Sequence, residues 1–122
     1  MLFAGAKAAF GQQLAPTAKS ATATLTIAEL LTGIVTTSGT AAITLTLPTG
    51  TLTDAGVTAP ALPVNGCFDW FVINTGTGSG AVTVAAGSTH TTVGSTAVPI
   101  ATSAGFRTRK TAANTFVTYR VR

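Results

Sequence analysis

The stretch Cys67-Phe-Asp-Trp-Phe-Val-Ile73 carries the clearest strand pattern in the sequence. Alternation puts Phe68, Trp70 and Val72 on one face, and Asp69, Phe71 and Ile73 on the other. Because both faces are largely apolar, we expect this strand to be buried on both sides. One side would face the core of the domain, and the other would face a second sheet or another subunit.

Shorter strand patterns lie on either side of this stretch, separated by segments rich in Gly, Pro, Thr and Ala. They cover residues 34–37, 42–47, 81–85, 90–93, 98–100, 106–110 and 116–121. About seven or eight short strands with frequent turns predict an all-β domain, a jelly-roll-like or Greek-key β-sandwich. A β-helix is the minor alternative, since no exact repeat of solenoid length is visible.

Helix and turn signals interrupt the strands. Thr26 and Glu29 have the spacing of a capping box, which predicts one short helix that ends at Gly33. Residues 53–55 allow one further helical turn. A phosphate loop needs a following helix, but the glycine-rich segment 76–80 precedes a strand pattern. We therefore interpret that segment as a hairpin turn.

Composition bounds the class of protein. Of 122 residues only 8% are charged, against 26 threonines, 22 alanines and 13 glycines. The chain is too apolar for a disordered linker, lacks an apolar run of membrane-spanning length, and has one Cys, which excludes a disulfide scaffold. We expect an N-terminal arm, residues 1–20, and a single β-sandwich domain, residues 21–122. Because few ions would lose water on contact, the low charge favours a permanent assembly.

Few side chains are available for chemistry. His90 is the only histidine, and we expect it to face solvent, a metal shared by three copies on a three-fold axis being the remote alternative. We expect Cys67 to be a buried structural thiol. Asp69 lies among aromatic residues and needs a partner, for which Arg107 or Arg109 is available. We expect no catalytic residue, no cofactor and no metal, and so no enzyme.

The cations are sorted by region, with none in residues 20–106 and five of seven in residues 107–122. The last strands would contact an acidic protein lattice, with nucleic-acid binding or a merely solvated strand face as alternatives. On the final strand we expect Val117, Tyr119 and Val121 to form a core face, opposite Arg120 and Arg122.

The arm, residues 1–20, has apolar residues at a spacing of four, but its glycines and proline favour an extended segment lying on a neighbour over a helix. A frayed terminus is the alternative. The candidate residues for binding a partner lattice or a neighbouring subunit, in the arm and on the last strands, are Leu2, Phe3, Lys7, Phe10, Lys19, Arg107, Arg109, Lys110, Arg120 and Arg122.

Five segments, residues 26–33, 43–49, 68–76, 82–87 and 105–121, together resemble small Thr/Ala-rich β-sandwich virion proteins of tailed bacteriophages, of the capsid decoration, cement or head-fibre type. The resemblance spans roughly residues 24–121. It implies a homotrimer that binds the major capsid protein lattice on the outer capsid surface and stabilises the shell. The single Cys67 fits a protein made in the reducing cytoplasm of the host. It implies no catalytic residues, and neither a membrane nor nucleic acid as partner. The alternatives are a fibre or adhesin module that binds host glycan, and a basic nucleic-acid-binding protein.

Overall fold

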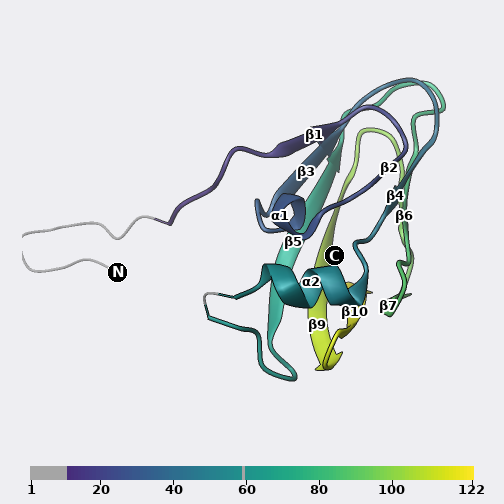
Figure 1. The fold of residues 1–122 in the computed structure, drawn as a ribbon. Coiled ribbons are helices and arrows are strands. Elements are labelled where there is room, and N and C mark those ends of the chain that lie inside the picture. The colour runs from purple at the N-terminus through teal and green to yellow at the C-terminus, as the bar shows by residue number, and fades with distance from the viewer. Residues whose placement is uncertain (1–10, 59) are drawn as a thin grey trace, which may run out of the picture.

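The computed structural model describes residues 11–58 and 60–122, and this part of the chain is mostly β with two short helices (Figure 1). The strands are β1 (Thr17–Lys19), β2 (Ala23–Thr24), β3 (Ile34–Thr37), β4 (Ile43–Thr46), β5 (Cys67–Asn74), β6 (Val82–Ala85), β7 (His90–Val93), β8 (Ala97–Val98), β9 (Ser103–Ala112) and β10 (Thr115–Arg120). The helices are α1 (Ile27–Leu30) and α2 (Gly50–Gly56).

The strands form two sheets around one apolar core. The six-stranded sheet has the order β1-β3-β5-β9-β10-β7, and the four-stranded sheet has the order β2-β4-β6-β8. Val35, Trp70 and Phe106 from the first sheet meet Leu45 and Val84 from the second in a single buried cluster. The rings of Trp70 and Phe106 stack with centroids 4.8 Å apart. The prediction of a β-rich fold is therefore confirmed.

The order of the strands differs from the one we expected. From β1 to β6 the chain alternates between the two sheets, and each strand pairs in parallel with the strand two before it. A jelly roll or Greek key is built from antiparallel neighbours, so neither describes this half. The N-terminal half is instead wound as three stacked coils, β1-β2, β3-β4 and β5-β6, which resembles the β-helix alternative more closely.

Within each coil a turn links the two strands, and these turns stack on one another at one end of the molecule (Figure 1). The N–H of Thr75 donates to the carbonyl of Thr37 at 2.8 Å, and the N–H of Thr77 donates to that of Gly39 at 2.9 Å. Gly80 is required here, because a Cβ at this position would lie 2.5 Å from the Gly39 oxygen. Residues 76–80 connect β5 in one sheet to β6 in the other, so our interpretation of a hairpin turn was wrong.

The opposite connections contain the helices. The capping box of α1 is confirmed: the N–H of Glu29 donates to Thr26 Oγ1 at 3.2 Å, and the N–H of Thr26 donates to Glu29 Oε1 at 2.9 Å. α2 is longer than the expected helical turn, because the Thr49 side chain caps it by accepting from the Leu52 N–H. The described residues thus contain two helices rather than one. Neither is long and apolar enough to cross a membrane.

The C-terminal half is largely antiparallel. β9 pairs with β10 in a hairpin and also with β5, so it joins the hairpin to the coiled half. β7 lies beside β10 in parallel. At the other end of the chain, residues 11–16 are exposed and Thr17–Lys19, within the expected arm, form the edge strand β1. Leu2, Phe3, Lys7 and Phe10 lie outside the described residues.

Candidate functional site: the outer face of the six-stranded sheet

The six-stranded sheet has one side turned away from the core. Trp70 and Val72 are fully buried, so alternation turns Asp69, Phe71 and Ile73 outward. The register places Arg107, Gly105 and Ser103 opposite these residues on β9, and Tyr119 opposite Arg107 on β10. We call this surface the outer face; its members are Ile34, Cys67, Asp69, Phe71, Ile73, Ser103, Arg107, Arg109, Val117, Tyr119, Val121 and Arg122.

The centre of the outer face is apolar. A Cβ at Gly105 would lie 2.9 Å from the Phe71 ring, so the ring lies directly over this glycine. The N–H groups of Val121 and Arg122 both donate to the Gly105 oxygen, at 2.9 and 3.2 Å, which sets both residues opposite it in a β-bulge. Ile73 and Val121 remain 38% and 45% exposed. We expected β5 to be buried on both sides, but in the single chain its second side is only partly covered.

Asp69 and Arg107 form a two-point ion pair beside this apolar centre. Arg107 Nε donates to Oδ1 at 2.6 Å and Nη2 donates to Oδ2 at 3.0 Å. This confirms Arg107 as one of the two partners predicted for Asp69. The hydrogen bond lowers the pKa of Asp69 and raises that of Arg107. Both side chains are more than 40% exposed, at 42% and 49%, so the pair orients charge more than it stabilises the fold.

Arg109 and Tyr119 form the second polar contact of the outer face. Arg109 donates to the Tyr119 hydroxyl from Nε at 3.0 Å and from Nη2 at 2.8 Å, and Nη1 donates to Asn65 Oδ1 at 2.7 Å. Tyr119 therefore lies outward, and our expectation that it shares a core face with Val117 and Val121 was wrong. The buried residues of β10 are Phe116 and Thr118.

Of the candidate cations that the structure describes, Lys19, Lys110 and Arg120 do not lie on this face. Lys19 Nζ pairs with Glu29 at 2.7 Å, and Lys110 Nζ pairs with Asp54 at 2.9 Å. Arg120 turns toward the core: Nη1 donates to the carbonyls of Ser95 and Ala97, and the guanidinium lies 5.8 Å from the centroid of the Phe106 ring. The basic set predicted from sequence is thus divided, and only Arg107, Arg109 and Arg122 share a surface.

The ion pairs account for the charge of the whole chain. Its three acidic side chains are each paired with one cation. The four cations left over are Lys7, outside the described residues, and Arg109, Arg120 and Arg122, which together equal the net charge of +4. Two of these four, Arg109 and Arg122, lie on the outer face.

His90 is not the solvent-facing residue that we expected. It is fully buried, with Nδ1 2.9 Å from the Pro48 oxygen and Nε2 2.7 Å from Thr118 Oγ1. The hydrogen bonds continue from Thr118 to Thr108 at 2.8 Å, and Trp70 Nε1 donates to Thr108 at 3.0 Å. Burial lowers the pKa of His90. Sequence alternation missed this chain because Thr and His count as outward residues unless their partners are known.

Cys67 is also placed differently from our prediction. It is exposed, as the first residue of β5 and opposite Arg109, where the strand extends beyond the core. Within residues 11–58 and 60–122, no three side chains among His, Cys, Asp and Glu lie close enough together to hold a metal ion.

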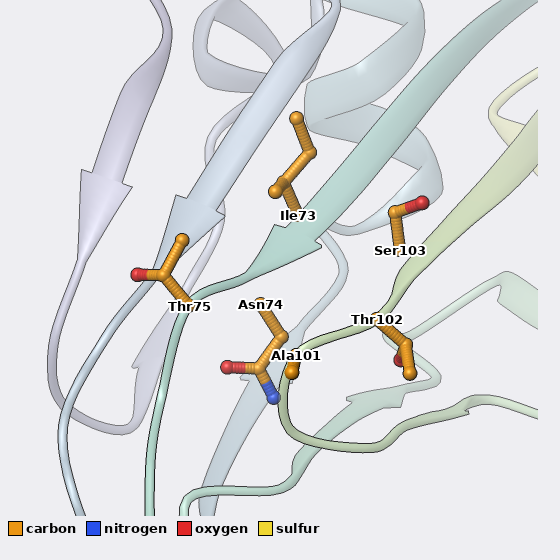
Figure 2. A pocket seen from close by; sticks show the side chains of 6 residues that line it. All are labelled: Ile73, Asn74, Thr75, Ala101, Thr102 and Ser103. Carbon is orange, nitrogen blue, oxygen red and sulfur yellow. The ribbon is translucent and has the colours of Figure 1, made fainter.

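A shallow hollow adjoins the outer face where β5 ends and β9 begins, lined by Ile73, Asn74, Thr75, Ala101, Thr102 and Ser103 (Figure 2). Asn74 donates to the carbonyls of Gly80 and Val98 and accepts from the N–H of Gly76. The hydroxyls of Thr75 and Thr102 donate to the backbone carbonyls of Thr37 and Pro99. These polar groups form hydrogen bonds that hold the turns, so they are not available to bind a ligand. We therefore treat the hollow as an extension of the outer face.

The arrangement is thus a flat surface with an apolar centre, two aromatic rings and three arginines, and its geometry suits contact with another macromolecule. Comparisons of the chain with protein-family models, with curated proteins and with solved structures found no match.

Proposed function

We propose that the chain is a structural virion protein of the capsid decoration or cement type, which forms a homotrimer and stabilises the shell of a tailed bacteriophage. The observation that carries the proposal is the uncovered outer face, with Phe71, Ile73 and Val121 partly exposed on a rigid sheet. Exposed apolar patches on soluble chains mark interaction sites. The resemblance described from the sequence supplies the kind of assembly.

The location would be the outer surface of the capsid. The strand-rich body would contact the major capsid protein lattice, and the segment before β1 would contact the shell or a neighbouring subunit. Figure 1 shows that residues 11–16 run away from the body, which leaves them free to make such a contact.

Two observations lower the support for the alternatives. A glycan-binding fibre module would favour an exposed tryptophan for stacking, but Trp70, the only tryptophan of the sequence, is fully buried against Phe106. Nucleic-acid binding through the last two strands would use their cations together, but Lys110 and Arg120 lie away from Arg109.

The proposal is tested by two measurements on the purified full-length protein. Native mass spectrometry should give the mass of a trimer. Pelleting with emptied shells of the phage that encodes the chain should bring the protein down at a saturable ratio. A monomer at all concentrations that stays in the supernatant would contradict the proposal.

The role of the arm needs a separate variant. Deletion of residues 1–10 removes Leu2, Phe3, Lys7 and Phe10 and leaves every described strand in place. We expect this variant to stay folded and to bind shells more weakly. Unchanged affinity would show that residues 1–10 take no part in docking.

A further inference from the structure

We infer that the outer face docks on an acidic protein surface that presents apolar side chains between its carboxylates, and that this partner is not a second copy of the chain. The inference deepens the proposed function. Only the statement that the acidic surface belongs to the phage shell rests on that proposed function. The inference states which side of the molecule contacts the partner, and which chemistry the partner's surface must have to fit that side.

The net positive charge of this face, three arginines against the one carboxylate of Asp69, disfavours self-association through it. Among the described residues, Arg109 and Arg122 form no ion pair with a side-chain carboxylate, although the charge of Arg122 helps to lower the pKa of Asp69. Glu29, Asp54 and Asp69 are each held by a different cation at 2.6–2.9 Å. Residues 1–10 contain no acidic side chain either. A second copy would therefore bring arginines against arginines, with no free side-chain carboxylate to neutralise them. Burying unpaired charges is costly, whereas an acidic partner supplies their counterions.

The apolar centre favours a protein over a nucleic acid. The cores of protein interfaces are enriched in aromatic residues and Arg and depleted in Lys. The outer face matches this composition, with Phe71, Tyr119 and three arginines and no lysine. A nucleic acid would bind mainly through its phosphates, which match the arginines but leave the partly exposed Ile73 and Val121 at the apolar centre without a matching surface.

Labelling of Cys67 can report whether the outer face is covered. Cys67 is its only cysteine, is exposed and lies opposite Arg109 in the β5–β9 register. The rate at which its thiol reacts with a maleimide therefore measures whether the face is covered. The matched control is C67S/T83C, which moves the thiol to the exposed side of β6 in the four-stranded sheet.

The first measurement uses soluble probes of defined chemistry: a random copolymer of Glu and Tyr, polyglutamate, and oligo-dT. With the copolymer at about ten times its Kd, labelling of Cys67 should slow about tenfold, because only the free face reacts. Labelling of C67S/T83C should stay unchanged. Polyglutamate and oligo-dT should protect Cys67 less at equal charge concentration.

Variants then separate the two components of the face. R109Q/R122Q should weaken copolymer binding roughly tenfold or more. T51E/T83E makes the same change of net charge at exposed positions on α2 and β6, and should have a small effect. F71S should weaken binding of the copolymer but not of polyglutamate. V121S, at a more exposed position, repeats that test should F71S fold poorly.

The same labelling with emptied shells separates this inference from the proposed function. Shells that bind the protein without protecting Cys67 would overturn the inference and leave the proposed function standing. Protection of Cys67 by the copolymer, without binding of the protein to shells, would support the inference and contradict the proposed function. The inference is also overturned when neither copolymer nor shells protect Cys67, when oligo-dT protects it better than the copolymer, or when T51E/T83E weakens binding as much as R109Q/R122Q.

Discussion

The coiled half, β1 to β6, and the antiparallel half, β7 to β10, hold their strands in place by different means. In the coiled half, aliphatic residues such as Leu25, Val35 and Leu45 fill the space between the sheets, and backbone hydrogen bonds stack one turn on the next. In the antiparallel half, buried polar side chains from three strands are bonded to one another. The stability of the coiled half therefore depends on the volume of its buried side chains and on the close approach of its turns. The stability of the antiparallel half depends on the hydrogen-bond partners of its buried polar side chains.

The polar chain has one consistent direction. The Pro48 carbonyl can only accept, so in neutral His90 the hydrogen lies on Nδ1 and Nε2 accepts from the Thr118 hydroxyl. Thr118 then accepts from the Thr108 hydroxyl, which in turn accepts from the N–H of the Trp70 indole. Every hydroxyl is satisfied only when His90 is neutral. This half of the core is thus specified by a set of donors and acceptors that fits one register.

Removal of core volume from the coiled half should have the largest effect. Leu45 is fully buried on β4, between β2 and β6, so Leu45→Ala should lower the free energy of unfolding by about 3 kcal/mol. Thr46→Ala, on the other side of the same strand, is the control. Equal shifts of the urea midpoint in both variants would show that the apolar core does not hold this half.

Crowding a stacked turn tests the close approach of the coils. A Cβ at position 80 would lie 2.5 Å from the Gly39 oxygen, so Gly80→Ala should cost about 2 kcal/mol as the two turns move apart. Gly11→Ala serves as control, since nothing lies within 4 Å of a Cβ there. Equal stability of the two variants, measured by thermal unfolding, would mean that the turns do not stack closely.

Breaking the polar chain tests the antiparallel half in the same way. Thr118→Val keeps the shape of the side chain but leaves the acceptor Nε2 of His90 without a donor, and should cost about 1–3 kcal/mol. Thr83→Val, at an exposed position of β6, should change stability little. Should Thr118→Val unfold at the same denaturant concentration as Thr83→Val, the hydrogen-bond chain would contribute nothing to the half that we assign to it.

The two halves also differ in how far the sequence predicts them. The approximate positions of β3 to β10, the capping box at Thr26 and the pairing of Asp69 with an arginine follow from local patterns, and the structure confirms them. The short strands β1 and β2 were not predicted. The parallel winding does not follow from local patterns, because the number of residues between paired strands differs from one pair to the next. Val35 pairs with Val72, 37 residues later, whereas Ile43 pairs with Val82, 39 residues later.

One signal for the coils is present in the sequence. Residues 38–40 read Ser-Gly-Thr and residues 75–77 read Thr-Gly-Thr, and each is followed by an alternating strand, at 43–45 and at 82–84. Two additional residues in the later turn obscure the repeat. A search that allows turns of different length would find it.

The candidate site could be predicted in part for a different reason. The outward side of β5 is visible in the alternation around Trp70, but on β10 Thr118 lies inward and Val117 outward. Thr and Val have almost the same shape, so only the partners of the hydroxyl determine which of them is buried. Those partners, His90 and Thr108, come from other strands, and no local pattern shows them.

Acidification should destabilise the antiparallel half first. Burial lowers the pKa of His90 below its ordinary value of 6.5, so the unfolded chain binds a proton that the native chain does not. The contribution of His90 is therefore complete above about pH 6.5 and decreases as the pH falls below it, by at most about 1.4 kcal/mol per pH unit for one proton.

Urea midpoints between pH 7.5 and pH 5 measure this slope, in a range above the ordinary pKa of the carboxyl groups. His90 is the only histidine, so His90→Gln should remove most of the pH dependence while lowering the midpoint itself. A wild-type midpoint that does not change over this range, or the same slope in His90→Gln, would contradict the neutral state that the polar chain requires.

The smallest expected effect concerns the outer face, which lies where the two halves join at β5 and β9. The Asp69–Arg107 side chains are 42% and 49% exposed, so Asp69→Asn should change stability by about 1 kcal/mol or less. Asp54→Asn is the matched comparison. Its carboxylate is only 16% exposed, accepts from Lys110 and from the backbone N–H of Asn114, and thereby holds the β9–β10 turn. We expect the Asp54 variant to lose clearly more stability than the Asp69 variant in urea. If the two losses were equal, the outward ion pair would be part of what holds the halves together, and its exposed position would no longer indicate a surface kept for a partner.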